Sequence, residues 1–115
     1  MFIAYAIVAI VLSLALVGSG FAKLSRQPRI IESLTGLGVP LSWLPHLALA
    51  EIAGAIGLII GLWVPALGIA AGVGVVLYFV GALITHLRAH DRELAGPTVL
   101  GLLAIAAVVL RSLSW

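Results

Sequence analysis

Long apolar stretches without charged side chains limit the possible folds of this chain more than any other feature of its sequence. Residues 1–22 carry no charge, and further apolar stretches follow at short intervals. About 20 apolar residues suffice to cross a bilayer core as a helix. Only 9% of the 115 residues are charged and 63% are hydrophobic, whereas a soluble domain is about a quarter charged. The sequence therefore predicts an integral membrane protein.

The spacing of polar interruptions predicts an all-α membrane protein, a four-transmembrane-helix bundle that forms a single domain over residues 1–115. The expected spans are about 2–22, 45–63, 65–88 and 96–114. Pro28 suits the first turn of a short helix between spans one and two, and its apolar residues fall on one face. We expect this short helix to lie in the membrane interface.

The distribution of basic residues predicts the orientation. The loops after spans one and three hold Lys23, Arg26, Arg29, Arg88 and Arg92. Only Arg111 lies at the opposite side, so the positive-inside bias makes both loops cytoplasmic and places both termini outside. The abundance of Ala, Gly, Val and Leu with little Lys is compatible with a bacterial plasma (inner) membrane protein.

Composition also excludes several classes of function. The chain has no cysteine, which rules out disulfides, thiolate metal sites and thiol redox relays within it. A net charge of +2 is too small for a nucleic-acid-binding face. No nucleophile with a base and no paired carboxylates are evident, so an autonomous enzyme is poorly supported.

Glu51 is an ionisable residue about a third of the way along the second span, where an unpaired carboxylate is costly. It lies on the order of 10 Å into the membrane at 1.5 Å per residue. Lys23, Thr85 and His86 are expected at comparable depth and are the candidate partners. Two interpretations stay open: a structural ion pair that fixes the helices, or a pocket that binds a quinone, a lipid headgroup or a proton.

Three histidines are conceivable ligands of a metal ion. His86 and His90 are four residues apart, and His46 begins the second span on the same side. No acidic motif accompanies them, and histidines are common at membrane boundaries. We therefore predict no metal. The polar groups outside this side of the bundle are few, with Tyr5 and Arg111 among them.

Small residues recur at helical spacing in the second and third spans. The candidate helix-packing positions are Gly54, Gly57, Gly61, Gly68 and Gly72. Small residues let helix backbones approach closely in a membrane. If the chain holds more of them than four helices can bury, the surplus indicates a surface for a partner helix.

The sequence resembles the DoxX-like membrane proteins. The resemblance rests on Gly20-Phe21-Ala22-Lys23-Leu24, on Glu51 followed by Gly54 and Gly61-Leu62, and on the four short spans. It implies a four-helix bundle in a family associated with membrane oxidoreductases, including partners of quinol and thiosulfate oxidation and of superoxide defence. More distant relatives look like assembly factors or cargo receptors. Lys23 and Glu51 carry over as the matching polar positions.

We therefore expect a small non-catalytic accessory subunit of a larger bacterial inner-membrane assembly, either an oxidoreductase or a lipid or solute transporter. The alternative is a redox component that binds a quinone in a pocket formed by Lys23, Glu51 and His86. Expected partners are larger integral membrane proteins, and anionic lipids at Lys23, Arg26 and Arg29. No nucleic-acid partner is expected, and a quinone is the one cofactor considered.

Overall fold

The computed structural model describes residues 1–25, 28–89 and 94–115, which form five α-helices and one short 3-10 helix. These elements are α1 (Phe2–Leu24), α2 (Pro28–Gly36), η1 (Leu41–Trp43), α3 (Leu44–Ile60), α4 (Pro65–Arg88) and α5 (Ala95–Leu113). Four helical segments, α1, η1 with α3, α4 and α5, are long and apolar enough to cross a membrane. The predicted all-α fold, with a short helix between the first two spans, is confirmed.

The observed helices differ from the predicted spans by a few residues at their ends. α1 continues past residue 22, so Lys23 lies in its last turn. α3 ends at Ile60 rather than at Trp63, because the amides of Leu62 and Trp63 bond three positions back, to the carbonyls of Ile59 and Ile60, in tight 3-10 turns. Pro65 then begins α4, as expected for a residue without an amide hydrogen.

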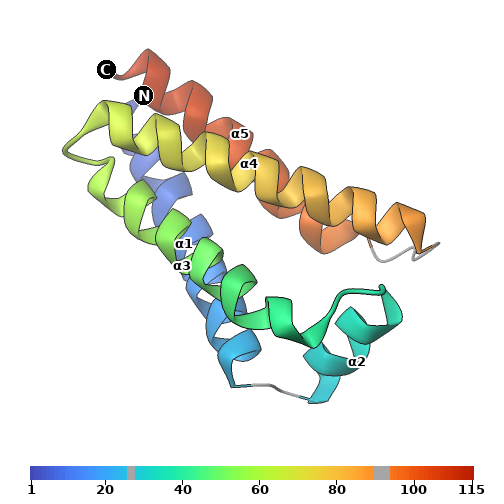
Figure 1. Ribbon diagram of the computed structural model, residues 1–115. Coiled ribbons are helices and arrows are strands. Elements are labelled where there is room, and N and C mark those ends of the chain that lie inside the picture. Colours follow the sequence, from blue (N-terminus) through green and yellow to red (C-terminus); the bar gives the residue numbers. More distant parts are fainter. Residues whose placement is uncertain (26–27, 90–93) are drawn as a thin grey trace.

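The long helices form two arms that meet at one end and diverge at the other (Figure 1). α1 packs mainly on α3, and α4 packs mainly on α5. Both termini and the α3–α4 turn lie at the closed end, whereas α2 lies at the open end (Figure 1). The bundle therefore has a compact end and a splayed end.

The closed end holds most of the apolar core. The fully or nearly fully buried side chains of the whole core are Tyr5, Ala9, Leu12, Leu16, Ala55, Leu58, Val75, Phe79, Ala104 and Ala107. Glycine is required where α3 meets α4, since a methyl group at Gly61 would overlap the backbone of Gly68 and the Tyr5 hydroxyl. The other predicted packing glycines also lie close to neighbouring helices: a Cβ would come 2.7 Å from Val75 at Gly54, 2.6 Å from Ala71 at Gly57 and 2.6 Å from Val108 at Gly72.

A polar cluster at the closed end completes the hydrogen bonding of the α3 C-terminus. The Tyr5 hydroxyl donates to the Leu58 carbonyl at 2.7 Å. The Arg111 guanidinium donates to the carbonyls of Gly61 at 2.7 Å and Leu62 at 3.4 Å. It also lies over the Phe2 and Tyr5 rings. Carbonyls at a helix end have no partner within the helix, and a membrane supplies no water, so these donors hold the closed end together.

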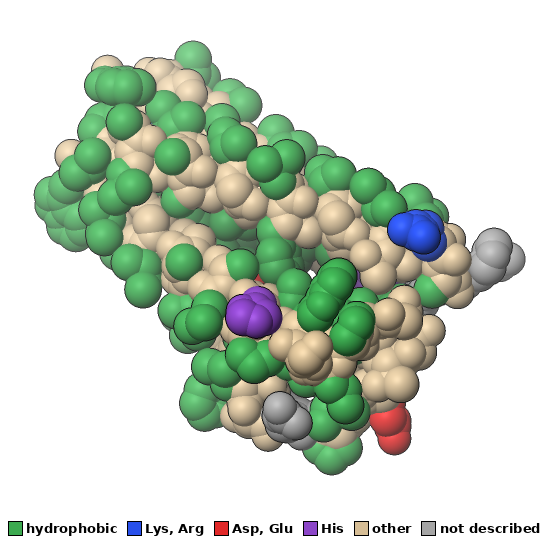
Figure 2. Space-filling model, viewed as in Figure 1, with side chains coloured by type: hydrophobic (Ala, Val, Ile, Leu, Met, Phe, Trp, Pro, Cys, Tyr) green, Lys and Arg blue, Asp and Glu red, His purple; other side chains and the backbone are tan. Residues whose placement is uncertain are grey.

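The outer surface is apolar. Hydrophobic side chains cover most of the visible face of both arms, and the face is hollowed between them (Figure 2). Large apolar side chains such as Ile7, Leu49, Leu77 and Leu102 are exposed on the four long helices. This surface is suited to contact with lipid tails.

α2 differs from the other α-helices, because it is short and has no buried residue. A tight turn ends it, in which the Val39 amide bonds to the Leu34 carbonyl. Gly38 adopts φ +79° in this turn, a conformation that favours glycine. The turn directs the chain back into η1 and α3 at the open end of the bundle.

Candidate functional site

An ion pair between α1 and α3 is the centre of the candidate site. Lys23 Nζ lies 2.5 Å from Glu51 Oε1. The carboxylate is 1% exposed and the Lys23 side chain 12% exposed, so both charges are largely removed from the surface. Lys23 also donates to the Ser19 hydroxyl one helical turn earlier, at 2.8 Å. Because Lys23 lies in the last turn of α1, its long side chain can extend back into the bundle.

α4 contributes a third group to this cluster. The Tyr78 hydroxyl donates to Glu51 Oε1 at 2.7 Å. Lys23 and Tyr78 therefore share one carboxylate oxygen, and among the described residues the buried Oε2 has no hydrogen-bond partner. Leaving a buried charged acceptor unpaired costs about 1–3 kcal/mol or more. The cluster is thus positioned by three helices and keeps unused capacity to accept a hydrogen bond.

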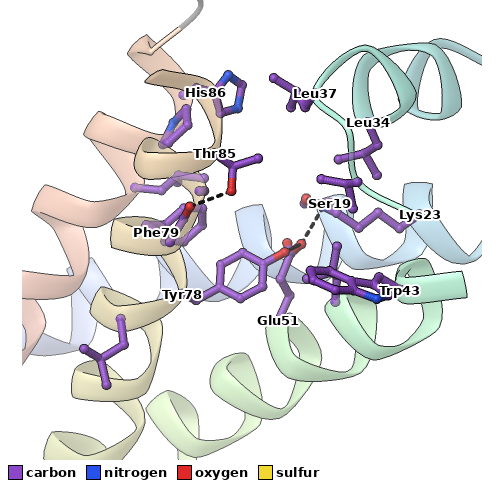
Figure 3. A pocket seen from close by; sticks show the side chains of 18 residues that line it. Ser19, Lys23, Leu34, Leu37, Trp43, Glu51, Tyr78, Phe79, Thr85 and His86 are labelled. Carbon is purple, nitrogen blue, oxygen red and sulfur yellow. Dashed lines mark hydrogen bonds and ion pairs between the residues drawn. The ribbon is translucent and has the colours of Figure 1, made fainter. Parts of the chain in front are cut away.

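Glu51, Lys23 and Tyr78 line a cavity of about 480 Å³ at the open end of the bundle (Figure 3). We call this cavity the main pocket. Its walls are Ser19, Lys23, Leu34, Leu37, Val39, Trp43, Leu47, Glu51, Leu77, Tyr78, Phe79, Gly81, Ala82, Thr85, His86, Gly96, Pro97 and Leu100. Its volume lies within the range of about 300–1,000 Å³ that is typical of small-molecule sites. The lining is mostly apolar, with a few polar groups concentrated near Glu51.

α2 forms one wall of the main pocket. Leu34 and Leu37 face α4 across the cavity (Figure 3). Trp43 of η1 adds an aromatic ring near Glu51 (Figure 3). Leu34 of α2 and Leu37 of the turn after it thus border the cavity between the two arms.

The predicted polar residues are distributed over this pocket. Lys23 and Glu51 are in direct contact. Thr85 and His86 line the same cavity, but the Thr85 hydroxyl donates to the Gly81 carbonyl of its own helix at 2.9 Å. His86 lies about 12 Å farther along α4 than Tyr78, at 1.5 Å per residue. Tyr78, rather than His86, is the α4 residue that bonds to Glu51.

The three histidines considered for a metal site differ in their placement. His46 is exposed at the start of α3, His86 lines the main pocket, and His90 falls outside the described residues. Within the described ranges, no group of three or more His, Cys, Asp or Glu side chains could hold a metal ion.

Sequence reasoning missed the role of Tyr78, although the helical hairpin offers a signal for it. α3 and α4 run antiparallel from the tight turn at residues 61–64. Glu51 lies 10 residues before that turn (61 − 51), whereas Tyr78 lies 14 after it (78 − 64) and His86 lies 22 after it (86 − 64). Counting residues outward from the turn therefore places Tyr78 within four residues, about 6 Å, of the depth of Glu51, whereas His86 lies much farther out.

A comparison with known protein families found a match over most of the chain. The model of the DoxX-like family matches residues 7–109, a range that includes the three residues of the polar cluster and parts of all four long helices. Neither the curated proteins nor the solved structures include a match to the chain.

Proposed function

Because this chain belongs to the DoxX-like family and encloses a polar cluster within its membrane-spanning helices, we propose that it binds a quinone-type molecule in the main pocket. The observation that carries this proposal is the Glu51 carboxylate. One of its oxygens receives two donors, and the other has no partner among the described residues. A ligand hydroxyl would satisfy the second oxygen.

The reduced, quinol form complements the site best. In the ion pair Glu51 is a carboxylate, which only accepts hydrogen bonds, and a quinol hydroxyl donates one. The Lys23 ammonium has three N–H donors and uses two of them, on Ser19 and Glu51. The remaining N–H can donate to a ligand oxygen, so the cluster offers both an acceptor and a donor.

The walls of the pocket suit an aromatic ring. Trp43 and Phe79 are aromatic, and Leu47 and Leu100 are aliphatic. An apolar lining with a few convergent polar groups is typical of sites for small amphipathic molecules. A quinol is such a molecule, because its flat ring is apolar and its two oxygens are polar.

We propose that the protein serves as an accessory subunit that exchanges quinol with a larger membrane assembly. The chain has no cysteine and so supplies no thiol relay for electrons. Gly18 on α1 is exposed, and a Cβ added there would meet no atom within 4 Å, which leaves a small-residue surface that a partner helix can approach. Our placement in a bacterial plasma membrane with α2 on the cytoplasmic side remains a prediction, as do anionic lipid contacts at exposed Arg29.

The proposal is tested by extracting the protein from native membranes in a mild detergent. Quinones in the lipid extract are quantified per chain, and co-purifying proteins are identified by mass spectrometry. We expect close to one quinone per chain, together with larger membrane proteins at fixed stoichiometry. A purified, folded protein that carries no quinone and binds none on titration contradicts the binding proposal. Recovery of the protein without partners contradicts the accessory role.

A further inference from the structure

A second cavity runs along the seam between α3 and α4. Its volume is about 670 Å³, and we call it the seam groove. Much of its lining consists of small residues, among them Ala53, Gly57, Ala70 and Gly74. Its polar side chains are Glu51 and Tyr78, at one end of the groove. The rest of the groove is therefore suited to hydrocarbon.

The seam groove adjoins the main pocket at the level of the polar cluster. Glu51, Leu77 and Tyr78 line both cavities. A molecule whose ring contacts Glu51 in the main pocket therefore has an apolar groove next to it, on the other side of Tyr78, for an apolar substituent. This groove follows the two helices toward the closed end of the bundle.

The length of the seam groove suits a flexible hydrocarbon chain. Its α4 wall extends from Tyr78 back to Leu67, about 16 Å at 1.5 Å per residue. The groove is therefore long enough for a hydrocarbon tail that lies along the two helices.

We propose that the seam groove binds the hydrocarbon tail of the quinol whose ring occupies the main pocket, so that the ligand is a long-chain membrane quinol rather than a tail-less one. This inference rests on the proposed function. It adds a separate binding determinant, because the tail contacts residues that the ring does not reach. Apolar contact holds the tail, since Glu51 and Tyr78 are the polar side chains that line the groove.

The chain offers matched glycines for a test. Gly74 lines the groove and Gly81 lines the main pocket, and an added Cβ at either meets nothing within 4 Å. A Cβ at either position therefore fits without displacing a neighbour, and Gly74→Leu and Gly81→Leu each add apolar bulk at the lining of one cavity. Gly18→Leu is the control, because Gly18 has equal space and lines neither cavity. Ala70→Leu is a second groove variant.

The experiment titrates each purified, folded variant with two hydroquinones that share a dimethoxy-methyl ring, one without a tail and one with a decyl tail. Each affinity is divided by that of the wild type, which cancels partitioning into detergent. We expect Gly74→Leu and Ala70→Leu to weaken binding of the tailed compound at least about tenfold and to leave the tail-less compound unchanged, since displaced methylenes lose apolar contact. Gly81→Leu should weaken both, and Gly18→Leu neither.

The outcomes separate the two proposals. If both groove variants bind the tailed compound as the wild type does while Gly81→Leu weakens both compounds, the tail inference is overturned and the proposed function stands. If the wild type binds neither compound, the proposed function fails and the tail inference fails with it.

Discussion

The Lys23 ammonium lies 2.5 Å from the Glu51 carboxylate and joins the last turn of α1 to the first half of α3. Removing two charges from water is costly, so a buried ion pair by itself is weak evidence for stability. Here the pair lies at the open end of the bundle, beside a cavity and next to Tyr78. The proposed ligand binding and the positioning of the helices therefore involve the same atoms, and only conservative substitutions can separate them.

Two buried or half-buried tyrosines provide a matched test of the polar cluster. Tyr78→Phe removes the hydroxyl that bonds to Glu51 and should lower the free energy of unfolding by about 2 kcal/mol, because the acceptor is charged. Tyr5→Phe removes the bond to the Leu58 carbonyl and should cost about 1 kcal/mol. Denaturation in detergent measures both changes.

Only the first of these substitutions should alter ligand binding. Tyr78 lines the main pocket, whereas Tyr5 lies in the core of the closed end. We expect Tyr78→Phe to weaken quinol binding severalfold and Tyr5→Phe to leave it unchanged. Equal effects of the two variants on binding would show that Tyr78 acts through general stability alone.

Arg111 should be a structural residue. Arg111→Met removes the donors to the Gly61 and Leu62 carbonyls, which then lie without partners at the end of α3. We expect the free energy of unfolding to fall by at least about 2 kcal/mol. Arg88→Met is the control, because Arg88 is exposed, and it should change stability little. A variant at Arg111 as stable as the wild type would contradict this account of the closed end.

The crossing of α3 and α4 should tolerate no side chain at Gly61. Gly61→Ala places a methyl group against the Gly68 backbone and should destabilise the protein by roughly 1–3 kcal/mol through overpacking. Gly18→Ala adds the same methyl group in open space, and should be neutral or stabilising by up to about 1 kcal/mol because alanine favours a helix. The temperature of thermal unfolding should fall for Gly61→Ala, and it should rise or stay unchanged for Gly18→Ala.

The predicted orientation can be measured cleanly because the chain has no cysteine. Ser33→Cys places an exposed thiol on α2, and Trp115→Cys places one at the C-terminus. In intact spheroplasts, a membrane-impermeant maleimide should label the C-terminal thiol and not the α2 thiol. Labelling of the α2 thiol alone would reverse the orientation.

The sequence is sufficient to predict the helices and to limit the partners of Glu51 to a few residues, for a physical reason. Each span is a long apolar run, and a charge such as Glu51 inside one must find a partner among the few available. Lys23 is the nearest basic residue that can extend along its own stem into the membrane. Composition and depth leave Lys23, Thr85 and His86 as candidates, and the structure shows that Lys23 forms the ion pair.

Other parts of the site depend on how the helices diverge, which the sequence does not encode locally. No feature of the sequence next to Tyr78 marks it as a partner of Glu51. Its hydrogen bond to Glu51 depends on the register of α3 against α4. In the sequence, Arg111 is an isolated charge near the membrane boundary. In the structure it is buried, and its guanidinium donates to the Gly61 carbonyl at the end of α3. The main pocket exists because the two arms separate, a property of the whole bundle.

The most direct test of the central claim compares quinol with quinone binding in the wild type and in Glu51→Gln. Glutamine keeps an oxygen for Lys23 and Tyr78, but it replaces the second carboxylate oxygen with an amide donor that cannot accept a quinol hydroxyl. We predict that the wild type binds the quinol more tightly than the quinone. In Glu51→Gln, which should remain folded, the ratio of quinol to quinone affinity should fall by at least about tenfold, because a charge-assisted hydrogen bond is lost. Ser13→Ala, which alters a buried hydroxyl away from the pocket, should retain the preference. An unchanged preference in folded Glu51→Gln would contradict the claim that this carboxylate holds the ligand.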